Sequence, residues 1–167
     1  MSDLNKYTKW IDGPVDYSPE FSAVARAVAK RISDHTGLVW RHDEDMNYSA
    51  GQRLNTTFSP EGSPIAREDE TGTFMVIIYL SSRAKVWSVL VRQLQIDKKY
   101  GSIWNTAPLG AERPWLLKAI RAVSEVLHSL GWIRIADSEL DAVVEGHVTE
   151  LDGKPATLFE VLFSELP

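Results

Sequence analysis

The sequence of 167 residues predicts an α+β fold. We expect a mainly antiparallel twisted sheet of about five to seven strands, with two long amphipathic helices packed on one face. Two segments repeat apolar residues at helical spacing, and runs of short β-rich segments lie between and after them. Strands that follow one another directly pair as hairpins, which makes the sheet antiparallel. We expect residues 1–167 to form a single domain, because the length suits one core.

The first predicted helix begins at Ser18 and Pro19 and ends at Gly37. Serine caps the first turn, proline suits the first helical position, and glycine adopts the left-handed conformation that closes a helix. Its apolar stripe comprises Phe21, Val24, Ala25, Val28, Ala29 and Ile32. The second helix begins at Pro114 and ends at Gly131, with a stripe of Leu116, Ile120, Val123, Leu127 and Leu130. Each stripe needs an apolar sheet face to cover it.

Strands are predicted where β-branched and aromatic residues alternate or cluster. These segments are residues 38–40, 53–58, 73–80, 86–94, 132–135, 147–151 and 157–163. Residues 86–94 also match one face of a helix, and the short connection before them favours a strand. The Asp152-Gly153 pair predicts a tight turn between the last two strands, and residues 137–144 predict a short helix.

Three segments are predicted to be irregular. Residues 1–17 form an irregular lead-in that contains the breaker Gly13-Pro14. Residues 59–72 and 95–112 are rich in proline, glycine and polar residues, and we expect two long loops there.

Amino-acid composition limits the cellular compartments and the kinds of chemistry that we expect for this protein. The chain has no cysteine, which excludes disulfides, zinc ribbons and thiol catalysis. Its first ten residues are polar and do not match a signal peptide, and its longest apolar run is too short to cross a bilayer. We therefore expect a cytoplasmic protein without a membrane partner.

The sequence lacks the familiar catalytic and cofactor motifs. GxGxxG, GxSxG, HExxH and the phosphate-binding loop of nucleotide triphosphatases are all absent, so no catalytic residue, cofactor or metal is assigned. One alternative is a hydrolase or transferase with a site around His42 and the carboxylates at 43–45. Asp43, Asp45 and Asn47 also match the opening of a calcium loop, but the later glycine and glutamate of that loop are missing. An acidic turn in solvent is the expected structure.

Charge is divided unevenly along the chain. Residues 83–121 carry eight basic and two acidic residues, whereas residues 137–167 carry one basic and eight acidic residues. The basic segment, with its interleaved aromatic residues, suggests nucleic-acid binding as a second alternative. The net charge of −5 argues against it, because phosphate binders are usually basic.

The acidic segment and the aromatic residues of the predicted loops suggest a protein-binding surface. Carboxylates attract a basic partner, and an exposed aromatic ring can anchor an interface. The predicted contacts are Glu139, Asp141, Glu145, Glu150 and Asp152, with Trp104 and Tyr100 as alternative anchors. The expected partner is another protein with a basic surface, and a homodimer is left open.

A small body of helices on a twisted sheet resembles secretion chaperones and toxin-neutralising immunity proteins. The resemblance lies in architecture alone and transfers no residue. It implies a small acidic protein-binding module that acts as an immunity-like, antitoxin-like or chaperone-like inhibitor.

Overall fold

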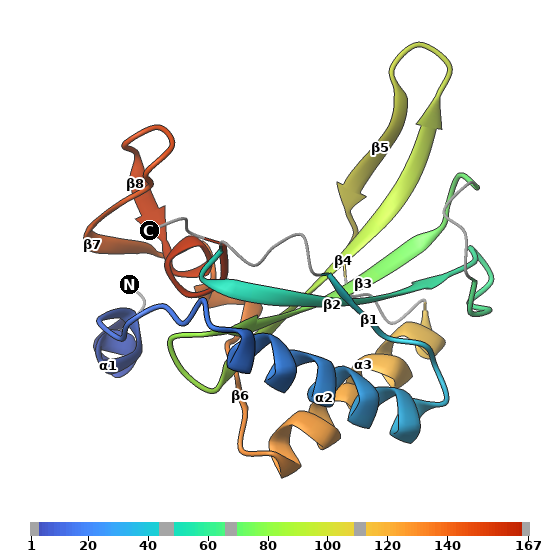
Figure 1. The fold of residues 1–167 in the computed structure, drawn as a ribbon. Coiled ribbons are helices and arrows are strands. Elements are labelled where there is room, and N and C mark those ends of the chain that lie inside the picture. The colour runs from blue at the N-terminus through green and yellow to red at the C-terminus, as the bar shows by residue number, and fades with distance from the viewer. Residues whose placement is uncertain (1–3, 44–48, 66–69, 109–112, 165–167) are drawn as a thin grey trace.

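The structure, a computed structural model, describes residues 4–43, 49–65, 70–108 and 113–164. It is an α+β fold (Figure 1). The N-terminal half contains η1 (Leu4–Tyr7), α1 (Thr8–Ile11), α2 (Pro19–Thr36), β1 (Arg41–Asp43), β2 (Gly51–Phe58) and β3 (Phe74–Ser81). The C-terminal half contains β4 (Val86–Asp97), β5 (Gly101–Thr106), α3 (Pro114–Ser129), β6 (Ile133–Arg134), η3 (Asp137–Glu139), β7 (Val143–Val148), β8 (Pro155–Thr157) and η4 (Glu160–Ser164).

The main sheet has six strands and is mostly antiparallel, as predicted. Strands β1 to β5 follow one another in chain order, and β6 pairs with β4 in parallel. Strands β7 and β8 form a second, two-stranded sheet. The segment 86–94, which also matched a helix, lies within the long strand β4.

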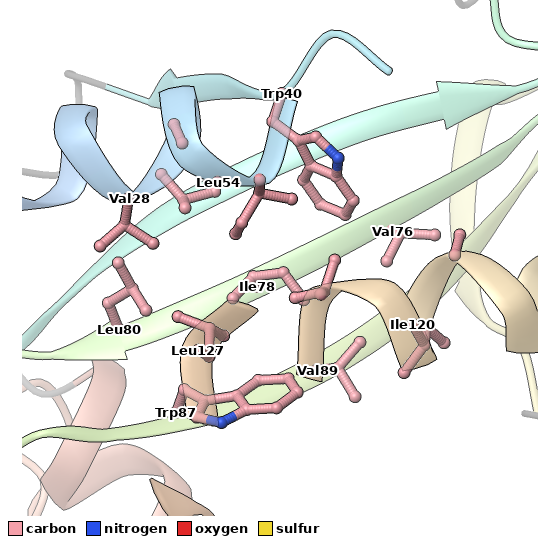
Figure 2. Close-up of a cluster of buried hydrophobic side chains, with 14 of the residues drawn as sticks. Val28, Trp40, Leu54, Val76, Ile78, Leu80, Trp87, Val89, Ile120 and Leu127 are labelled. Atoms are coloured by element: carbon pink, nitrogen blue, oxygen red, sulfur yellow. The ribbon is translucent and has the colours of Figure 1, made fainter. Parts of the chain in front are cut away.

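Helices α2 and α3 cover one face of the main sheet. α2 begins after Ser18, whose Oγ accepts a hydrogen bond from the N–H of Phe21 at 3.3 Å, and it ends at Gly37 with a φ of 70°. The core beneath both helices comprises Leu54 from β2, Val76, Ile78 and Leu80 from β3, and Trp87 and Val89 from β4, against Val28, Ile120 and Leu127 (Figure 2). Alternation along β3 places every second residue in this core.

A second core lies on the opposite face of the sheet. The sequence had predicted a helical layer on one face only. Ile77 and Tyr79, the alternate residues of β3, pack there with Tyr7 and Ile11 from the N-terminal segment and with Phe163. The rings of Tyr79 and Phe159 meet edge to face with centroids 4.9 Å apart. The prediction of two long helices on one face was therefore incomplete, because short helices from both ends of the chain cover part of the other face.

Close packing of η4 explains a glycine in β2. A Cβ at Gly51 would lie 2.7 Å from the carbonyl oxygen of Phe163 and 3.0 Å from that of Leu80. The backbone of the C-terminal segment therefore rests directly on the strand, at a distance that only glycine permits.

Two predicted irregular segments are partly regular. Residues 1–17 contain η1 and α1, which form because Tyr7 and Ile11 lie one helical turn apart and are both buried. Residues 95–112 were predicted as a loop, but β4 continues to Asp97 and β5 runs back from Gly101. The Asp97 carboxylate accepts the N–H groups of Lys99 at 2.7 Å and Tyr100 at 2.9 Å, which closes the hairpin.

The last predicted strand is mostly helical. β8 ends at Thr157, and residues 160–164 form the π-helical turn η4. Thr157 donates its N–H to Glu160 Oε2 at 2.7 Å, and the N–H of Glu160 is 3.3 Å from Thr157 Oγ1. This reciprocal cap begins the helix, and a short apolar run does not distinguish helix from strand by spacing alone.

Three smaller differences concern neighbouring segments. The first strand lies at 41–43 rather than 38–40, and β6 is confined to two residues. The predicted helix 137–144 is a single turn, η3, and β7 already begins at Val143. In the predicted loop 59–72, residues 59–65 and 70–72 contain no helix or strand, apart from a bridge between Phe58 and Pro64. Residues 66–69 and 109–112 of the two predicted loops lie outside the described residues.

Candidate protein-binding surfaces

Two hairpins project from the side of the sheet that α2 and α3 leave uncovered (Figure 1). One is the β7–β8 hairpin near the two termini, and the other is the end of the long β4–β5 hairpin. Most of the residues predicted to bind a partner lie on these two elements.

The β7–β8 hairpin is attached on one face and exposed on the other. Val144, Ala156 and Leu158 are buried in the second core and hold it to the body. Its turn is closed by the N–H of Thr149, which donates to the carbonyl of Lys154 at 2.8 Å. The hairpin exposes three apolar side chains, with exposed fractions of 56% for Val143, 58% for Val148 and 86% for Leu151.

Two of the predicted carboxylates are engaged within the protein. Glu139 accepts a hydrogen bond from the Tyr7 hydroxyl and lies 2.6 Å from Lys6 Nζ, and these contacts, Lys6 first, lower its pKa. Asp152 lies 2.5 Å from Lys154 Nζ and accepts the Thr149 hydroxyl, which lowers its pKa to about 2. The contacts of Glu139 join the N-terminal segment to η3, and those of Asp152 stabilise the β7–β8 turn.

The other three predicted carboxylates face solvent. Asp141, Glu145 and Glu150 are exposed, and none of them forms an ion pair with any residue that the structure describes. They lie on or beside the same hairpin that exposes Val148 and Leu151. Free carboxylates and bare apolar side chains thus share one surface, which we call the β7–β8 surface.

The two predicted aromatic anchors have different surroundings. Tyr100 lies at the turn of the β4–β5 hairpin with 69% of its surface exposed, and Lys99 Nζ lies 4.9 Å from the centre of its ring. Trp104 pairs with Leu94 across the hairpin and is half-buried. It lines a cavity of about 230 Å³ on the open face of the main sheet.

The segment around His42 serves as a structural link in the described structure. His42 Nε2 is hydrogen-bonded to the side-chain oxygen of Gln52, and the Gln52 amide donates to Ser22 Oγ at 2.8 Å. This chain connects β1 and β2 to α2. Residues 44–48 of the suggested metal or catalytic site lie outside the described residues, and no group of three possible metal ligands occurs among the rest.

The basic residues of segment 83–121 are spread over several parts of the fold. Arg83 Nε donates to the carbonyl of Val161 at 2.9 Å, and Lys85 Nζ lies 3.0 Å from that of Leu130. Arg92 lines the cavity beside Trp104, and Lys98 lies at the β4–β5 turn. In the part of the chain that the structure describes, the segment forms several separate positive sites, which does not favour a nucleic-acid groove.

Comparison with known proteins supplies no relative. No known protein family, curated protein or solved structure matches this chain. Of the helices in the described ranges, none combines the length and the apolar character needed to cross a membrane. The function is therefore inferred from the surfaces of the protein itself.

Sequence reasoning missed the apolar half of the β7–β8 surface and the whole cavity. Val143, Val148 and Leu151 are interspersed with acidic residues, which is typical of an exposed hairpin. Only the charges of this segment entered the prediction, and these apolar residues were overlooked. The cavity residues come from five different strands, and no local spacing brings them together.

Proposed function

We propose that this protein is a protein-binding module, an immunity-like or chaperone-like inhibitor, which binds a basic partner through its β7–β8 surface. The observation that carries the proposal is the combination on one hairpin of unpaired carboxylates with exposed apolar side chains. Charges at the rim speed and orient the encounter, and apolar area supplies most of the affinity.

Anchoring of the hairpin also supports the proposal. Val144 and Leu158 are buried beneath it, so the surface is held by the second core and needs little ordering when a partner binds. The β4–β5 turn, with the exposed side chains of Ile96 and Tyr100, offers a second contact on the same side of the sheet. A concave partner could touch both hairpins.

Affinity capture followed by measurement on the purified partner tests this function. Tagged protein is incubated with an extract of the source cells, and the bound proteins are quantified by mass spectrometry. We expect one stoichiometric partner with a basic surface. The triple variant E145Q/E150Q/L151S is expected to weaken its affinity by roughly tenfold or more, with most of the charge contribution disappearing at high salt.

A control variant changes the same residue types elsewhere. E61Q/E70Q/L117S removes two exposed carboxylates and a half-exposed leucine from a loop and from α3, and it is expected to bind like the wild type. Equal loss in both triple variants, or unchanged binding by the first, contradicts the proposal. A partner whose activity is unaffected by binding contradicts the inhibitor role specifically.

A further inference from the structure

The open face of the main sheet contains a cavity that is separate from the β7–β8 surface. Its volume is about 230 Å³, and its lining combines Asp43, Arg53 and Asn55 with Met75 and Ile77, together with Arg92 and Trp104. We infer that this cavity is a binding site for a carboxylate group carried on a flat or apolar body.

Register along the sheet explains how these side chains converge. Asp43 pairs with Arg53, Asn55 with Ile77, and Met75 with Arg92 on neighbouring strands. Residues that pair directly across strands point to the same face. Arg41, which pairs with Asn55, adds an exposed positive charge on that face beside the cavity.

Arg53 is only partly satisfied. Its Nη2 lies 2.5 Å from Asp43 Oδ2, whereas its Nε is buried and has no hydrogen-bond partner among the described residues. Arg53 is among the residues that line the cavity, and its guanidinium has more donors than the one that Asp43 accepts from. Those donors can serve an anion that enters the cavity.

The remaining polar groups of the lining are also available. Arg92, Asn55 and the Trp104 indole are half-buried, and none of them forms a side-chain hydrogen bond or an ion pair within the described chain. Arginine and the indole N–H are donors only. The cavity therefore offers several donors and one carboxylate already used by Arg53, a set that matches an anion.

The apolar part of the lining selects among anions. The lining itself carries one net positive charge, from two guanidinium groups and the Asp43 carboxylate, and its apolar side chains favour a carboxylate on an apolar body over a strongly hydrated phosphate. A carboxylate also matches the planar fork of arginine. The Trp104 ring, Met75 and Ile77 then contact the body that carries it.

Titration with benzoate tests the site on the full chain. Binding is followed by calorimetry and by the indole N–H resonances in proton–nitrogen spectra. We expect benzoate to shift one indole resonance, identified as that of Trp104 by its absence in Trp104→Phe. Benzamide, its neutral analogue, and inorganic phosphate are expected to bind at least roughly tenfold more weakly.

Matched variants distinguish a specific benzoate site from nonspecific electrostatic attraction of the anion to the protein. Arg92→Gln and the conservative Arg53→Lys are expected to weaken benzoate binding by roughly tenfold, with thermal unfolding confirming that both are folded. Arg121→Gln removes the same charge from an exposed position on α3 and is expected to have no effect. Equal weakening by Arg92→Gln and Arg121→Gln, or no benzoate binding at millimolar concentration, overturns the inference.

A peptide probe identifies the source of the carboxylate. The probe is acetyl-Ala-Ala-Phe with a free C-terminus. If it binds more tightly than benzoate and than its own C-terminal amide, the site is assigned to a peptide chain terminus. Tighter binding of benzoate assigns it to a free small molecule. Tighter binding of phosphate than of either overturns the carboxylate assignment. The β7–β8 triple variant is expected to bind benzoate normally, so the two proposals fail independently.

Discussion

Arg83 connects three distant parts of the chain through one side chain. It lies in the connection between β3 and β4, and its guanidinium donates to the carbonyls of Val161 at 2.9 Å, of Ile11 at 3.3 Å, and of Gly13. A fixed fork of five donors can satisfy several carbonyls at once. Nothing in the local sequence distinguishes this arginine from the others in the basic segment.

Replacement of Arg83 is expected to loosen both ends of the chain. Arg83→Met keeps much of the apolar stem but leaves the three carbonyls without their donor, and we expect a loss of about 2–3 kcal/mol in the free energy of unfolding. Urea denaturation measures it. Arg121→Met on the exposed side of α3 is the control and is expected to change that free energy by less than about 0.5 kcal/mol. A comparable loss in both variants contradicts the role of Arg83.

At the scale of elements, the N-terminal segment is held by a polar cluster. Tyr7 from η1 donates its hydroxyl to Glu139 of η3, and Lys6 lies 2.6 Å from the same carboxylate. Burial raises the pKa of Tyr7, and the hydrogen bond to Glu139 raises the pKa of Lys6. These contacts join segments 132 residues apart in sequence.

This cluster predicts a pH dependence of stability. The pKa of Glu139 is lowered from 4.5, so its stabilising contribution is fully present above that value and is lost as the pH falls through the folded-state pKa. Lys6 has a raised pKa, so its contribution is present below 10.5 and is lost as the pH rises through the folded-state value. Unfolding free energies measured from pH 7 to 3 should fall less steeply in Glu139→Gln than in the wild type.

The control for this measurement is Glu61→Gln, at an exposed loop position. It should keep the wild-type slope. An unchanged slope in Glu139→Gln would show that the contact with Lys6 and Tyr7 does not couple folding to pH.

The elements that sequence predicts best are those with long periodic patterns. The limits of α2 follow from Ser18 and Gly37, and β3 follows from its β-rich composition. By contrast, β5 is almost wholly exposed and has little apolar alternation, so composition made it resemble a loop. The run after Thr157 was misassigned because capping by Glu160 outweighs its β-propensity.

The whole molecule has two cores that share β3 and β4. Leu127 lies in the core under the helices and Leu158 in the core on the opposite face, and both are fully buried. Because alternate residues of β3 enter each core, loss of one core removes support from the other. This arrangement predicts a single cooperative domain.

Coupling of the cores is tested with one substitution in each. Leu127→Ala and Leu158→Ala are each expected to lower the free energy of unfolding by about 2–5 kcal/mol. Unfolding curves from far-ultraviolet circular dichroism and tryptophan fluorescence should coincide for both variants. Leu117→Ala, at a half-exposed position on α3, should have a small effect. Separate transitions in either variant would instead indicate two independent units.

The candidate surfaces were predicted unevenly. The exposed carboxylates Glu145 and Glu150 and the exposed ring of Tyr100 could be proposed from sequence, because charge and turn signals are local. Glu139 could not be separated from them, since Lys6 and Tyr7 meet it only in the folded chain. Asp152 is held by its sequence neighbours Thr149 and Lys154. Trp104 was predicted to be an anchor in a loop, and it lies instead on a strand beside a cavity.

What the sequence alone determined is the α+β class, the amphipathic stripes of α2 and α3 and the uneven charge along the chain, because periodicity and composition are properties of neighbouring residues. Only the tertiary structure decided that both ends of the chain cover the second face of the sheet. It alone placed Arg53, Arg92 and Trp104 around one cavity. Both arrangements depend on strand register and on contacts between residues far apart in sequence, which no local pattern records.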